Sequence, residues 1–132
     1  MGIQLNWDDD IHSIIYWRFE ERWTIEHLEA AVVRNLQMLD TASDRVDLIL
    51  DISQGGLVPL NLVRFIRYYR VTPHPLSHLK ILVGADDYLQ LLWRNIAPFA
   101  PRHLQIEFAD SLDEARKIIE QDREQMVTPS CS

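Results

Sequence analysis

The sequence has little of what marks secreted, membrane-spanning or nucleotide-binding chains. Its single cysteine, Cys131, excludes an internal disulfide and a cysteine-based metal site. No apolar run approaches the roughly 18 residues that cross a bilayer, and the opening MGIQLN lacks the pattern of a signal peptide. Among only four glycines, the pair at 55–56 fits neither nucleotide-binding loop. These absences predict a cytoplasmic chain that neither contacts a membrane nor binds a nucleotide.

The composition is that of one folded domain with an uneven charge distribution. Hydrophobic residues make up 47% of the 132 residues and charged residues 25%. The net charge of −7 divides into −7 over residues 1–60, +4 over 61–105 and −4 over 106–132. An acidic chain repels a phosphate backbone, so no nucleic-acid binding is expected. A charged protein partner or a second copy of the chain fits this surface better.

Hydrophobic periodicity predicts five strands. Residues 3–7 and 11–20 alternate apolar and polar side chains, which is typical of a half-buried β-hairpin. The segments RVDLILDIS at 45–53 and LKILVGA at 79–85 are apolar on both faces, as are parallel strands covered by helices. Alternation returns at 104–108, where an edge or half-covered strand is expected.

Four helices are expected between and after these strands, because apolar residues recur there every three or four positions. They cover residues 24–41, 59–70, 88 to the residue before Pro98, and 111 onward. Their expected N-terminal caps are Thr24, Asp86 or Asp87, and Ser111. The order ββαβαβαβα predicts an α/β fold, with an N-terminal β-hairpin, a mostly parallel five-stranded sheet and four helices. One domain is expected over 1–124, followed by a flexible tail at 125–132.

Several segments together resemble the STAS superfamily, whose domains are similar to an anti-sigma factor antagonist of sporulation. The resemblance covers residues 3–124 and rests on the element order and on hydrophobic pattern. It is carried by the run WRF leading into WTIE, by the strand LILDIS and by the closing segment SLDEARKII. It implies a SpoIIAA/STAS-like fold and a regulatory module that acts through protein contacts.

One family feature is missing. Anti-sigma antagonists of this family carry an Asp-Ser-Ser-Gly or Asp-Ser-Thr-Gly segment, with a phosphorylatable residue at the start of the second helix. The corresponding stretch here, DISQGGLVPLN at 51–61, has no Ser or Thr at the helix start. Ser53 is the one phosphorylation candidate, and its alternative role is a turn hydroxyl. The resemblance therefore implies a module without the usual phosphorylation switch.

Acidic residues follow the predicted parallel strands, where open α/β sheets bind ligands. Asp51, Asp86 and Asp87 could surround a cation or another polar ligand, or they could serve as helix caps and turn residues. His74 and His78 are four residues apart, but Pro75 lies between them, so a helical metal-binding face is not expected. No nucleophile elbow G-x-S-x-G occurs. No catalytic residue, metal or cofactor is therefore predicted.

The positive charge of the middle segment gathers along one predicted helix edge. Arg64, Arg67 and Arg70, together with Tyr68, recur at helical spacing. This arginine edge is either an interaction surface for an anionic partner or second copy, or a solvated helix face. Binding through it should weaken as salt rises.

Two functions of different classes fit the sequence. The first is a non-catalytic protein-interaction module, which could be a homodimer and which needs a packed interior and an exposed apolar patch. The second is a carrier of a small apolar or lipid-like ligand, since some STAS-like domains are related in fold to lipid-binding proteins. A carrier needs an internal cavity of several hundred cubic ångströms. An uncharacterised enzyme is the third reading.

Overall fold

The computed structural model describes residues 2–54, 64, 74–99 and 105–127. Its five strands are β1 Ile3–Trp7, β2 Ile14–Phe19, β3 Val46–Asp51, β4 Ser77–Val83 and β5 Glu107–Ala109. Its helices are α1 Ile25–Thr41, α3 Asp87–Ile96 and α4 Leu112–Val127, with one 3₁₀ turn at Ala97–Phe99.

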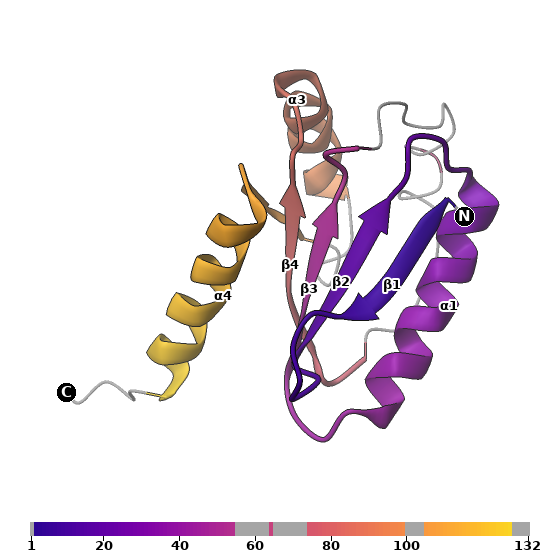
Figure 1. Cartoon of the computed structure of the whole chain (residues 1–132). Helices are drawn as coiled ribbons and strands as arrows, with labels where there is room; N and C mark the ends of the chain where they lie inside the picture. Colours follow the sequence, from indigo (N-terminus) through magenta and orange to yellow (C-terminus); the bar gives the residue numbers. More distant parts are fainter. Residues whose placement is uncertain (1, 55–63, 65–73, 100–104, 128–132) are drawn as a thin grey trace.

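The five strands form one mixed sheet in the order β1-β2-β3-β4-β5 (Figure 1). β1 pairs with β2 in antiparallel orientation, and the pairs β2–β3, β3–β4 and β4–β5 are parallel. The carboxyl ends of β2, β3 and β4 therefore meet at one edge of the sheet. β1 and β5 are the two edge strands.

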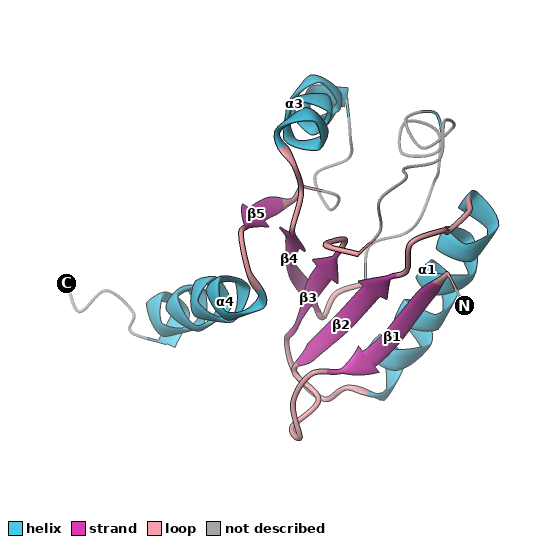
Figure 2. Ribbon diagram, turned by 45° about the horizontal axis from the view of Figure 1, so that its top comes forward, coloured by secondary structure: helices cyan, strands magenta, loops and turns pink. Residues whose placement is uncertain are grey.

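The hairpin side of the sheet is closed on one face by α1 (Figure 2). Trp17 and Phe19 of β2 and Leu48 of β3 pack there with buried residues of the helix, while Ile3, Leu5 and Trp7 are half-buried beside them. The indole N–H of Trp17 donates to the Asn35 side chain of α1 over 3.1 Å, which satisfies both buried polar groups.

The opposite face is closed by α4, which lies over β3, β4 and β5 (Figures 1 and 2). Its apolar residues Ala115 and Ile119 pack against Ile49 and Ile81, none of which is exposed to solvent. Burying a side chain of this size contributes roughly 1.5–3 kcal/mol. On the same face, Gln4, Asn6 and Arg18 of β1 and β2 stay exposed, and no described helix covers them.

The expected strands are found in the described residues with different ends: β2, β3 and β5 are shorter than expected, and β4 begins and ends two residues earlier. The segments 45–53 and 79–85 form β3 and β4, and the strand expected at 104–108 begins only at Glu107. The second helix, expected over 59–70, lies outside the described residues except for Arg64, which is helical. The described order is thus ββαββαβα, and the four-helix, mostly parallel arrangement that the sequence predicts is seen only in part.

The predicted helix starts agree with the side-chain contacts. Thr24 and Asp86 are the N-caps of α1 and α3, and the hydroxyl of Ser111 accepts the N–H of Glu114. The sequence did not indicate the role of His27, whose ring accepts the backbone N–H of Thr24 over 3.1 Å. A histidine thus takes the place of the usual Glu or Gln in this capping box.

A buried carboxylate joins α4 to the sheet. Asp47 of β3 has no solvent exposure, and it accepts hydrogen bonds from both Arg45 and Arg123. It also accepts the backbone N–H of Leu79 in β4 over 2.9 Å. Arg123 continues to the backbone carbonyl of Ser13, at the entrance to β2, over 2.8 Å. The side chains of Asp47 and Arg123 together therefore connect β3, β4, the entrance to β2 and the last helix.

We expect Asp47→Ala to lower the free energy of unfolding by about 3 kcal/mol, because it leaves two partly buried guanidinium groups without their shared carboxylate. Chemical denaturation with circular dichroism measures the loss. Asp10→Ala, which removes an exposed carboxylate in the hairpin turn, is the control and should stay within about 0.5 kcal/mol of the wild type. Equal stability of Asp47→Ala and the wild type would contradict this role.

Candidate functional site

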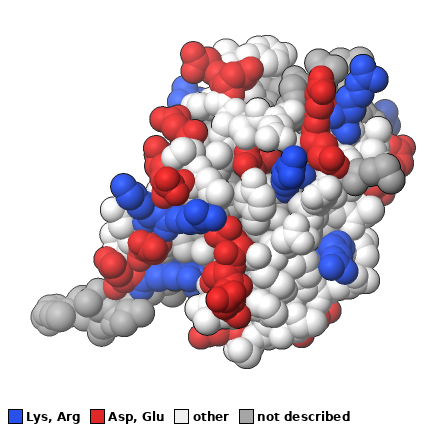
Figure 3. Space-filling model, viewed as in Figure 1, with Lys and Arg blue, Asp and Glu red and all other residues white. Residues whose placement is uncertain are grey.

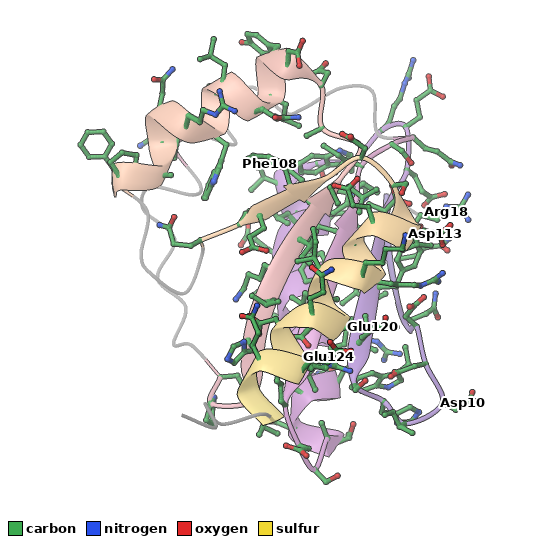
Figure 4. All side chains as sticks on the ribbon, turned by 90° about the vertical axis from the view of Figure 1, so that its left-hand side faces the viewer. Asp10, Arg18, Phe108, Asp113, Glu120 and Glu124 are labelled. Carbon is green, nitrogen blue, oxygen red and sulfur yellow. The ribbon has the colours of Figure 1, made fainter. Side chains whose placement is uncertain are left out.

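Two neighbouring sets of hydrogen-bonded polar side chains lie at the carboxyl ends of β2 and β3. We call them together the Asp51 cluster; it consists of Tyr16, Arg18, Asp51, Ser53 and Gln54. Arg18 and Asp51 are neighbours in the parallel register, so both side chains rise from the same face as Tyr16. Figure 4 shows Arg18 projecting from the sheet at the end opposite to Asp10.

Asp51 is the acceptor at the centre of this cluster. The hydroxyl of Tyr16 donates to its Oδ2 over 2.5 Å, and the hydroxyl of Ser53 donates to its Oδ1 over 2.6 Å. The backbone N–H of Ser53 also donates to Oδ1, over 3.0 Å, which fixes the turn after β3. Beside it, the guanidinium of Arg18 donates to Gln54 over 3.2 Å. Both carboxylate oxygens therefore have fixed donors.

The turn at Ser53 is held against the end of β4. The N–H of Ile52 donates to the carbonyl of Val83 over 3.0 Å. Gly84 follows with φ +83°, and a Cβ there would lie 2.8 Å from Ser53 Cα. Only glycine combines that conformation with so close an approach. The backbone of the cluster is thus set by its neighbour strand.

The contacts move two pKa values apart. Partial burial alone would raise the pKa of Asp51, but hydrogen bonds from Ser53 and Tyr16 and the charge of Arg18 hold it below its ordinary value of 3.8. Burial, the hydrogen bond to Asp51 and the carboxylate charge raise the pKa of Tyr16 from 10.0 to about 12. Near neutral pH, Asp51 is therefore ionised and Tyr16 is protonated.

The other two acidic residues predicted for a polar site, Asp86 and Asp87, lie at the N-terminus of a helix. Asp86 is the N-cap of α3 and accepts the N–H of Leu89 over 2.8 Å, while Asp87 is the first helical residue. Both are exposed, and no recorded contact brings either to Asp51. In the part of the chain that the structure describes, no group of three His, Cys, Asp or Glu residues is arranged to hold a metal ion.

The arginine edge is described at one position only. Arg64 is helical and exposed. Arg67, Tyr68 and Arg70 lie outside the described residues, so the predicted surface stays a prediction.

Sequence reasoning found Asp51 and Ser53 but missed Tyr16, Arg18 and Gln54. Tyr16 and Arg18 lie in the predicted hairpin strand at 11–20, and nothing in their spacing indicates that they reach the turn after residue 51. The available signal was the pairing of β2 with β3, since parallel neighbours align their carboxyl ends. The cluster thus consists of one carboxylate acceptor, Asp51, which hydrogen bonds hold in place, with exposed hydrogen-bond donors beside it.

Stability at alkaline pH should report the contact between Tyr16 and Asp51. A group whose pKa is raised on folding stabilises the protein fully below its unfolded pKa, and this contribution is lost as pH rises through the folded value. We therefore expect Tyr16→Phe to cost about 1–2 kcal/mol near neutral pH and to lack the part of the wild-type loss that falls between pH 10 and 12. Denaturation at several pH values measures it. Tyr88→Phe is the control, because this side chain is 73% exposed; identical profiles for both variants would refute the contact.

Comparisons of this chain with protein-family models, with curated proteins and with solved structures give no match. None of the helices in the described residues has the length and apolar character needed to cross a membrane. The assignment of function therefore depends on the fold and on the Asp51 cluster.

Proposed function

We propose that this chain is a non-catalytic, STAS-like regulatory module that binds a protein partner through the Asp51 cluster and the exposed sheet face beside it. The observation that carries the proposal is the set of hydrogen bonds from Tyr16 and Ser53 to Asp51, which holds this carboxylate beside the exposed Arg18–Gln54 pair. Arg18, Ser53 and Gln54 are the exposed members of that surface.

The fold supports this reading. The described residues form an α/β fold with an N-terminal hairpin and a mixed five-stranded sheet, which is compatible with the STAS resemblance. α4 covers β3 to β5, so the outer part of the same face carries exposed Gln4, Asn6 and Arg18. Figure 3 shows mixed charges over α4 and few charged side chains over β1 and β2. A partner that seats here would meet amides, one guanidinium and one carboxylate.

The protonation states of the cluster favour binding over acid–base catalysis. A general base or acid works best with a pKa near the working pH. The pKa of Asp51 is lowered and that of Tyr16 is raised to about 12, so the two groups move away from neutrality in opposite directions. These protonation states suit a structural hydrogen bond from Tyr16 to Asp51.

The same contacts argue against Ser53 as a phosphorylation switch. Its hydroxyl donates to Asp51, and a phosphate there would replace that donor with a charge of about −1.5 to −2 beside an ionised carboxylate. Like charges at this distance repel. These residues therefore fit a STAS-like regulatory module that lacks the usual phosphorylation switch.

The proposal is tested by affinity capture from cells of the source organism, followed by binding measurements on the captured protein. We expect Arg18→Glu to weaken binding by at least tenfold, because it places a second negative charge beside Asp51 at the contact surface. The matched control is Arg34→Glu, an equal charge reversal at an exposed position on α1, which covers the other face. It should bind like the wild type.

Two results would contradict the proposal. Equal binding by Arg18→Glu and Arg34→Glu would show that the Asp51 cluster does not face the partner. Native mass spectrometry of the purified wild type would favour the carrier function instead, if it found one small apolar molecule per chain and no protein partner. The carrier function stays a prediction from the sequence.

A further inference from the structure

β1 is an edge strand without the features that normally protect an edge. Its residues IQLNW include no charged residue and no proline, and within the described residues it has β2 as its single neighbour. Natural edge strands are usually blunted by charges, prolines, bulges or a cover. Ile3, Leu5 and Trp7 keep part of their surface exposed although α1 packs on their face. Among the described residues, no other strand occupies the free edge of β1, so that edge can pair with another strand.

The register with β2 identifies the backbone groups that face outward. Asp8 donates its N–H to Ile14, and Glu20 donates its N–H to Gly2, so the hydrogen-bonded pairs of this ladder involve the even-numbered residues of β1. In an antiparallel ladder the residues between such pairs direct their N–H and C=O groups to the other side. These outward residues are Ile3, Leu5 and Trp7.

This set of outward groups is complementary to itself. If a second β1 lies antiparallel with Leu5 opposite Leu5, then Ile3 lies opposite Trp7, and every pair joins two outward residues. The arrangement makes on the order of six backbone hydrogen bonds. A shift by two residues in either direction keeps the outward pattern but loses one of the three pairs. The central register is therefore the best one.

The side chains agree with the same register. Leu5 would meet Leu5, and Ile3 would meet Trp7, on the face that already carries the apolar cluster beneath α1. On the other face Gln4 would lie opposite Asn6, and two carboxamides can donate to and accept from each other. Cross-strand pairs of these kinds each stabilise a sheet by roughly 0.2–1 kcal/mol. No like charges come together within the strand.

From these observations we propose that two copies of this chain associate through β1, in antiparallel orientation about a two-fold axis at Leu5, to form one continuous ten-stranded sheet. The contact is isologous, because the same strand serves both copies. It shares Gln4 and Asn6 with the sheet face beside the Asp51 cluster, but it involves no member of that cluster and does not depend on the function proposed for it.

Sedimentation equilibrium tests the association and its chemistry. We expect a monomer–dimer equilibrium that is insensitive to salt, since the strand is uncharged. Leu5→Pro removes an outward N–H without removing a bond to β2. It should raise the dimer dissociation constant at least tenfold relative to Leu5→Ala, which removes most of the side chain but keeps the N–H. Both variants should keep the wild-type circular dichroism spectrum.

Cysteine cross-linking tests the register in a Cys131→Ser background. Leu5→Cys should form a dimer linked by a disulfide, because the facing Cα atoms of a hydrogen-bonded pair are about 5.5 Å apart. Ile3→Cys should not, because two copies of residue 3 would lie about 13 Å apart along the strands. This pair of variants has the same chemistry on the same face of one strand.

The proposal is overturned if the wild type stays monomeric at all concentrations. Binding of a different protein to the β1 edge would not support it. It is also overturned if Leu5→Pro and Leu5→Ala dimerise equally well, or if Ile3→Cys cross-links as readily as Leu5→Cys.

Discussion

The arrangement of this fold depends on one carboxylate that has no access to water. A buried charge is costly unless hydrogen bonds and opposite charges surround it. For Asp47 these come from Arg45 before its own strand, from the backbone of Leu79 in β4 and from Arg123 in α4. Because the guanidinium of Arg123 also reaches Ser13, the position of the last helix is tied to the starts of β2, β3 and β4 at once.

The same strand carries a second carboxylate at its other end. Asp47, Ile49 and Asp51 share one face of β3, since alternate residues point the same way. The first is enclosed by α4 and its partners; the last is partly exposed and is held by Tyr16 and Ser53. The buried carboxylate of Asp47 fixes α4 on the sheet. The partly exposed carboxylate of Asp51 lies among polar side chains at the surface. β3 thus has one carboxylate enclosed at its start and one partly exposed at its end.

Short sequence patterns predicted those features of the fold that depend on residues close together in the chain. The hairpin alternation, the two-sided apolar strand at 45–53 and the caps at Thr24 and Asp86 each depend on residues a few positions apart. The contacts that define the two ends of β3 span 76 residues from Asp47 to Arg123 and 35 from Tyr16 to Asp51. No spacing rule relates such positions, because the order of strands in the sheet brings them together. The sequence analysis did not single out Asp47, because it lies within a strand that is otherwise apolar on both faces.

We propose that Asp51 is ionised near neutral pH and acts as a hydrogen-bond acceptor that holds structure, without a part in acid–base chemistry. The most direct test of this proposal is a carbon-13 NMR titration that follows the Asp51 carboxyl carbon and the Tyr16 ring carbon bonded to the hydroxyl. The account predicts that Asp51 titrates below 3.8 and that Tyr16 titrates well above 10.0, near 12. Titration of either group between about pH 6 and 8 would contradict it, because such a pKa is that of a general acid or base.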